Sequence, residues 1–64
     1  MITIGQTYTT KSGMTVTIEH DKGDHNYPLF GRVMQPNGLV YRIAYYTLDG
    51  KYILGEDSEM DLVI

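Results

Sequence analysis

The chain has 64 residues, a formal net charge of −3 from eight acidic and five basic side chains, and no cysteine. This length allows one domain, expected to span residues 1–64, near the lower limit for a chain that folds without staples. The lack of cysteine excludes a disulfide and a cysteine-based zinc site. The shortage of lysine and arginine argues against non-specific nucleic-acid binding, which depends on a surplus of positive charge.

A domain this small has little stability in reserve, so a homodimer is one expected source of additional packing. No stretch approaches the length of a membrane span, and no basic segment precedes an apolar core as in a signal peptide. The sequence therefore predicts no membrane association. The absence of cysteine is typical of a reducing cytosol.

Four turn motifs divide the chain into short segments rich in β-branched and aromatic residues. Asn-Gly and Asp-Gly supply the positive φ that tight hairpins need, and the intervening residue types favour strands. The motifs are Lys11-Ser12-Gly13, the Asp-Lys-Gly-Asp of residues 21–24, Pro36-Asn37-Gly38 and Leu48-Asp49-Gly50.

The first half of the chain predicts a short opening strand over residues 2–4, an extended segment over residues 6–10 and a strand over residues 14–19. In the last of these, Met14, Val16 and Ile18 alternate with polar residues. This period of two is typical of a strand with one face on the core. Residues 20–28 are polar and too long for a tight hairpin, so we expect an exposed, mobile loop of the kind that often carries binding residues.

The second half predicts a third strand over residues 29–34, in which Gly31 marks a bulge or a close approach by a neighbouring backbone. Both faces of the fourth strand, residues 39–47, are apolar, which favours a central position in the sheet. A short strand follows over residues 52–54. Ser58 and Asp61 resemble a capping box around a single turn, and residues 62–64 return beside the first strand.

The expected fold is therefore all-β, a small antiparallel barrel of about five strands with at most one short helical or 3₁₀ turn. A set of alternating apolar positions is expected to form its core. These residues are Met14, Val16, Ile18, Val33, Ile43 and Leu62.

The order of these motifs is similar to that of a group of small, mostly uncharacterised bacteriophage and prophage proteins. The resemblance covers nearly the whole chain, through Gly-x-x-Tyr-x-Thr (5–10), Gly-x-x-Val-x-Ile (13–18), Tyr-Pro-x-x-Gly-x-Val (27–33), Tyr-Thr-x-Asp-Gly (46–50) and Ser-x-x-Asp-Leu-Val (58–63). It implies an SH3-like barrel and action in the cytoplasm of a bacterial host. Small phage proteins of this kind often inhibit host functions or defences.

Catalytic and metal chemistry are not expected. The two histidines, His20 and His25, lie in a flexible loop with Asp21 and Asp24, but their spacing matches neither a zinc nor a calcium site. No serine or carboxylate pair has a supporting constellation, and a chain this small has little room for a dry, supported active site. The sequence predicts a protein that is not an enzyme and has no cofactor or metal.

The tyrosines are more informative, because six of them in 64 residues provide contact area with a polar end. Tyr27 and Tyr46 are expected to be exposed, with Arg32 and Arg42 beside them if the third and fourth strands pair. Arginines among aromatic rings bind phosphates, nucleobases or acidic surfaces. The alternative is that each arginine only covers apolar surface with its stem. The predicted ligand- or partner-binding site consists of Tyr27, Arg32, Arg42 and Tyr46, with His25 and Asn26 at its margin.

Three functions follow as expectations. The first is a non-enzymatic, phage-type binding protein that docks on a host protein, through the tyrosine and arginine face or an exposed edge strand, as an inhibitor of host functions or defences. The second is an oligomer that sequesters a small nucleotide signal at a subunit interface. The third is an accessory or structural part of the virion.

Overall fold

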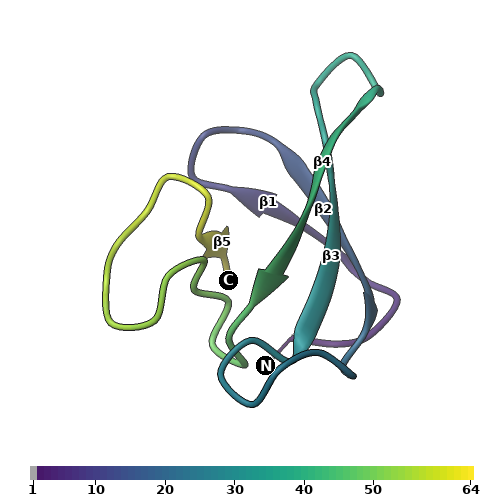
Figure 1. Cartoon of the computed structure of the whole chain (residues 1–64). Helices are drawn as coiled ribbons and strands as arrows, with labels where there is room; N and C mark the ends of the chain where they lie inside the picture. The colour runs from purple at the N-terminus through teal and green to yellow at the C-terminus, as the bar shows by residue number, and fades with distance from the viewer. Residues whose placement is uncertain (1) are drawn as a thin grey trace.

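The computed structural model of the chain describes residues 2–64 and contains one twisted antiparallel sheet of five strands, with no helix in those residues (Figure 1). The order across the sheet is β4-β3-β2-β1-β5. The strands are β1 (Thr7–Thr10), β2 (Thr15–His20), β3 (Leu29–Met34), β4 (Val40–Tyr46) and β5 (Leu62–Val63). The predicted all-β class and the five antiparallel strands are confirmed.

The first three predicted turn motifs lie between consecutive strands of the sheet, and the Leu48-Asp49-Gly50 turn follows β4. Gly13, Gly38 and Gly50 have φ values of +92°, +88° and +85°, the region that residues with a side chain rarely adopt. In the hairpin between β3 and β4 the Asn37 side-chain oxygen accepts a hydrogen bond from the Leu39 N–H at 3.0 Å. This is the local bond that makes asparagine a turn residue.

The core lies on one face of the sheet and confirms most of the predicted set. Its buried apolar residues are Val16, Ile18, Leu29, Val33, Ala44, Tyr46 and Leu62. Met14 is only partly buried. The prediction for Ile43 is wrong, because its side chain is 54% exposed. In β4 the row that contains Ala44 and Tyr46 faces the core. Both rows of this strand are apolar, so the sequence pattern does not distinguish the buried row from the exposed one.

Position 31 requires a glycine because other atoms of the protein approach it closely. The approaching atoms belong to side chains rather than to a neighbouring backbone. A Cβ at this position would lie 2.6 Å from Cγ1 of Val16 and 3.3 Å from the Tyr46 ring. The Tyr46 ring therefore occupies space that a larger residue in β3 would fill.

The sheet does not close into the predicted barrel, since β4 and β5 do not pair with each other within residues 2–64. Residues 47–52 cross the gap instead, and the Leu62 N–H donates to the Gly50 carbonyl at 2.9 Å. The predicted central position of β4 is also wrong, because β4 is an edge strand.

Two short predicted strands are replaced by less regular structure. Residues 2–4 lie outside any strand, and residues 52–54 contribute only an isolated bridge between Ile53 and Glu56. The motif at Ser58 forms a single turn, in which Asp61 accepts from the Ser58 N–H at 3.0 Å and Ser58 Oγ accepts from the Met60 N–H at 3.1 Å. The end of the chain returns to the sheet, but β5 pairs with β1 (Thr7–Thr10) rather than with the predicted opening strand over residues 2–4.

Candidate functional site

The face of the sheet opposite the core carries an exposed aromatic surface over β3 and β4, here called the outer aromatic face. On β4 its residues are Val40, Ile43 and Tyr45, all of them exposed, which pair with Met34, Arg32 and Phe30 of β3. Alternation in β3 places Phe30, Arg32 and Met34 on the same face. Contiguous apolar area of this kind on a small protein indicates an interaction surface.

Stacked rings hold one end of the outer aromatic face. The His20 ring lies parallel to the Phe30 ring, with centroids 4.7 Å apart and an interplanar angle of 4°. The edge of Tyr45 meets Phe30 with centroids 5.2 Å apart at 68°. Such stacked and edge-to-face arrangements fix ring positions, so this end offers a partner preorganised aromatic area.

Arg32 supplies the positive charge of the outer aromatic face. Its neighbours across the sheet are Thr17 and Ile43. Its guanidinium Nε lies 3.2 Å from a carboxylate oxygen of Glu19. The Arg32 side chain is 51% exposed, so the pair remains at the surface and available to a partner.

Arg42 lies on the opposite side of the sheet from Arg32, so the predicted patch of two arginines does not form. It shares the row of β4 that contains Ala44 and Tyr46, and its guanidinium carbon lies 5.9 Å from the centre of the Tyr52 ring. The prediction had placed both arginines on one face. Successive residues of a strand point to opposite faces of the sheet. Arg32 pairs with Ile43, so Arg42, which precedes Ile43, lies on the other face.

A groove runs beside the edge of β4 and brings together two of the predicted site residues, Arg42 and Tyr27. We call it the β4 groove. It has a volume of about 430 Å³ and opens widely to solvent. The Tyr27 hydroxyl accepts a hydrogen bond from the Leu54 N–H at 3.0 Å, which joins the 20–28 loop to the 52–54 segment across the end of the groove. Its lining residues are Asp24, Tyr27, Arg42, Ile43, Ala44, Tyr45, Tyr52 and Ile53.

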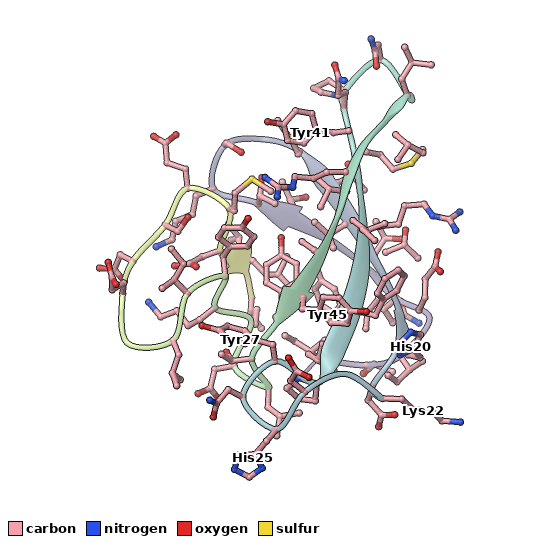
Figure 2. All side chains as sticks on the ribbon, in the orientation of Figure 1. His20, Lys22, His25, Tyr27, Tyr41 and Tyr45 are labelled. Carbon is pink, nitrogen blue, oxygen red and sulfur yellow. The ribbon has the colours of Figure 1, made fainter. Side chains whose placement is uncertain are left out.

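The remaining predicted loop residues stand apart from both surfaces. His25 and Asn26 are exposed and are not among the residues that line the β4 groove. Figure 2 shows His25 at the tip of its loop, with the ring pointing away from the sheet. The structure therefore groups neither residue with Arg32 or Arg42.

The prediction that Tyr46 is exposed is wrong, because its side chain is 0% exposed and lies in the core. The Tyr46 hydroxyl has no hydrogen-bond partner among the described residues. Burial, together with the nearby Tyr52 and Asp61, raises the pKa of Tyr46 to about 12. A neutral, buried phenol of this kind contributes to core packing. Of the neighbouring residues Tyr45 and Tyr46, Tyr45 is the one whose ring is exposed.

Replacing Tyr46 by phenylalanine is expected to leave the free energy of unfolding unchanged or to raise it by up to about 1 kcal/mol, because the lost hydroxyl makes no bond. Between about pH 10 and pH 12 the unfolded chain loses this proton while the folded chain keeps it. Stability of the parent protein therefore falls over that interval, and Y46F removes this part of the fall. Urea titration at pH 7 and pH 11 measures both effects, with the exposed Tyr41→Phe as control. A clear loss of stability for Y46F at pH 7 would contradict the assignment.

A second cavity, of about 320 Å³, lies at the start of the chain. No local pattern in the sequence indicates this cavity, because it combines residues from the start of the chain, the segment around Asp21 and Leu29, and the Leu48-Asp49 turn, which are far apart in the chain. Its lining residues are Ile2, Ile4, Asp21, Leu29, Leu48 and Asp49.

The described part of the chain contains no group of three or more histidine, aspartate or glutamate side chains placed to hold a metal ion. Residues 2–64 also include no helix whose length and apolar character would let it cross a membrane. In comparisons with protein-family models, curated proteins and solved structures, nothing matches this chain.

Proposed function

We propose that this chain is a non-enzymatic, phage-type binding protein of SH3-like fold that docks on a protein of the bacterial host and inhibits it. Five short antiparallel strands in one sheet, and the 47–52 segment that links its two ends through the Gly50–Leu62 bond, support the SH3-like assignment. The resemblance of the sequence motifs to phage proteins supports the host setting.

The outer aromatic face is the observation that carries the docking function. Its β4 residues are Val40, Ile43 and Tyr45, which are 56%, 54% and 43% exposed. Tyrosine, phenylalanine and arginine are enriched in the energetically dominant parts of protein interfaces. The Arg32–Glu19 pair at 3.2 Å adds both charges beside this apolar area, which lets a partner be selected by its charge pattern.

Photo-crosslinking in the bacterial host tests this function. A photoreactive residue at position 32 is expected to give one or a few discrete protein adducts, because Arg32 lies within the outer aromatic face. Position 11 is the matched control, because the Lys11 side chain is 49% exposed against 51% for Arg32 and Lys11 lies at the other end of the sheet. Adding Phe30→Ser should abolish the adducts while circular dichroism shows a folded chain.

The same adducts from both positions, or none from position 32, would contradict docking through this face. Phe30 and Arg32 lie on β3, which is not an edge strand. The crosslinking results therefore do not depend on whether another chain pairs with the edge of β4.

The β4 groove favours a second candidate, an oligomer that sequesters a small nucleotide. Tyr27 and Tyr52 offer rings for a base and Arg42 offers a charge for a phosphate. Asp24 also lines the groove, and its negative charge repels a phosphate. For this reason docking on a protein is the preferred proposal. Titration calorimetry against a panel of mononucleotides and cyclic dinucleotides, with Arg42→Ala as control, separates the two candidates.

A further inference from the structure

The second cavity lies where three segments that are far apart in the chain meet at one end of the sheet. Figure 1 shows the start of the chain, the loop between β2 and β3 and the turn after β4 together at this lower end. The volume of about 320 Å³ is within the range of small-molecule sites, about 300–1,000 Å³. A cavity of about 150 Å³ holds benzene, so this one has room for roughly twelve non-hydrogen atoms.

Local contacts hold the walls of the second cavity in place. The Thr3 N–H donates to the Tyr8 hydroxyl at 2.7 Å, which fixes the start of the chain on β1. In the turn after β4 the Gly50 N–H donates to the Thr47 carbonyl at 2.9 Å. A Cβ at Gly50 would lie 3.1 Å from Cδ1 of Ile2, so these two segments pack directly against each other. Walls that are fixed before binding reduce the entropy that a ligand must overcome.

Most of the lining of the second cavity is apolar. Its apolar residues are Ile2, Ile4, Leu29 and Leu48. Leu29 belongs to the core, whereas Ile4 and Leu48 are 44% and 69% exposed. Among the large apolar side chains that the structure describes, none is more exposed than Leu48. A ligand with an apolar body would remove this surface from water, which favours binding.

Two acidic residues complete the lining and determine the charge of the ligand. Asp21 lines the cavity from the β2–β3 loop and Asp49 from the turn after β4. The ion pairs formed within residues 2–64 include neither of them. The side chain of Lys22, the basic residue next to Asp21, extends away from the sheet in Figure 2. Two negative charges beside one concave, apolar space attract a cation and repel an anion.

From this combination we propose that the second cavity binds a small organic cation, a protonated amine carried by an apolar body. The apolar body lies against Leu29 and Leu48, and the ammonium group lies beside Asp21 and Asp49. A neutral ligand of the same shape gains only the apolar contacts. A fatty acid or a phosphate ester is repelled, and a diamine places its second charge against apolar walls, which costs free energy.

This site goes beyond the proposed docking function and does not rest on it. The second cavity shares no residue with the outer aromatic face or with the β4 groove. Failure of the amine to bind therefore leaves the crosslinking test at Arg32 unaffected, and failure of that test leaves the amine site unaffected.

Three ligands that share one apolar body test the charge requirement. Phenylbutylamine, phenylbutanol and phenylbutyrate are nearly equal in size, and near neutral pH they are a cation, a neutral molecule and an anion. Titration calorimetry of the untagged chain should give the amine a dissociation constant of about 0.1–1 mM, in keeping with its size of about eleven non-hydrogen atoms. The alcohol should bind about tenfold more weakly than the amine, and the carboxylate should bind least.

Backbone amide shifts in the nuclear magnetic resonance spectrum show where the amine binds. The signals of Ile4, Leu48 and Asp49 should move during the titration, because these residues line the second cavity. The signal of Arg32 on the outer aromatic face and that of Tyr45 in the β4 groove should stay in place.

Charge substitutions test the role of the two carboxylates. Asp21→Asn combined with Asp49→Asn should weaken binding of the amine about tenfold, the effect of two exposed ion pairs, and should leave binding of phenylbutanol nearly unchanged. Glu56→Gln combined with Asp57→Asn is the matched control. It also removes two negative charges from exposed positions, but neither residue lines the second cavity.

An apolar substitution tests the wall of the cavity. Leu48→Ser should weaken binding of the amine and of the alcohol alike, by at least about threefold, which corresponds to the loss of contact with one methylene group. Leu39→Ser is the matched control, because Leu39 is 64% exposed and lies in the hairpin between β3 and β4.

Equal affinity for the amine and the alcohol would overturn the proposal, and so would the absence of amine binding at millimolar concentration. Amide shifts confined to the β4 groove, or a control pair that weakens the amine as much as the Asp21 and Asp49 pair does, would also overturn it. The amide spectrum of each variant verifies that it folds. If a variant does not fold, the comparison of the three ligands on the parent chain decides the question.

Discussion

Replacing Ile18 by alanine is expected to lower the free energy of unfolding by about 2–4 kcal/mol, as for other large-to-small substitutions in a packed core. Ile18 is 0% exposed, and its Cδ1 lies close to Gly31 beneath the sheet. A small domain has only about 5–15 kcal/mol of stability in all, so this loss is large. Val16→Ala should have a similar effect. Urea titration followed by circular dichroism measures both.

Ile43→Ala provides the matched comparison, because it makes the same substitution on the exposed face of the sheet. It should change the stability by less than about 0.5 kcal/mol, as surface substitutions do. Equal losses for Ile18→Ala and Ile43→Ala would mean that the assignment of the faces is incorrect.

Replacing Asp61 by alanine is expected to lower the free energy of unfolding by about 2–4 kcal/mol, because it leaves two half-buried N–H groups without acceptors. Asp61 is 2% exposed. Its carboxylate accepts hydrogen bonds from the Tyr52 N–H at 2.8 Å and the Ser58 N–H at 3.0 Å. The ammonium groups of Lys51 and Lys11 lie 3.5 Å and 3.7 Å from it. One side chain therefore ties the 51–61 segment to the sheet.

The same carboxylate predicts how stability responds to acid. Burial raises the pKa of Asp61, but the Tyr52 and Ser58 N–H groups and the charge of Lys51 outweigh this effect and hold the pKa below its ordinary value. The unfolded chain therefore takes up this proton at a higher pH than the folded chain. The contribution is fully present above about pH 4, the ordinary pKa of an aspartate, and is lost as the pH falls through the lower pKa of the folded state.

Asp57→Asn is the control for Asp61, because Asp57 also pairs with Lys51 but its side chain is 84% exposed. It should leave the stability at pH 7 nearly unchanged, as expected for a surface pair. Asp61→Asn should both destabilise the protein at pH 7 and reduce its acid sensitivity, measured by urea titration from pH 2.5 to pH 7. If the two variants behave alike, Asp61 is not the residue that anchors the segment.

The outer aromatic face could be foreseen only in part. Alternation places Phe30, Arg32 and Met34 on one face of their strand, and it places Tyr41, Ile43 and Tyr45 together on one face of the next strand. The structure departs from this at one position, because a register shift between Val33 and Met34 brings Val40 rather than Tyr41 to the outer face. For β4, alternation does not show which face meets the core, because both rows of its side chains are apolar. The candidate site therefore combined Arg32 with Arg42 and Tyr46, although these residues lie on opposite faces.

The sequence by itself determined the features that depend on neighbouring residues. Glycines with positive φ define the hairpins, the strict alternation of Val16 and Ile18 with threonines defines the buried face of β2, and Ser58 with Asp61 defines the last turn. These are local effects of backbone sterics and side-chain period, and they hold whatever the rest of the chain does.

Tertiary structure alone decided what depends on residues far apart in the chain. The Tyr46 ring is buried because Gly31, in the neighbouring strand, leaves space for it. Asp61 is an anchor because Tyr52 and the two lysines meet it from other segments. β4 lies at an edge because the sheet continues from β3 to β2 and then through β1 to β5. The local sequence pattern of a strand is compatible with either face on the core and with a central or an edge position. Packing between residues far apart in the chain decides which of these occurs.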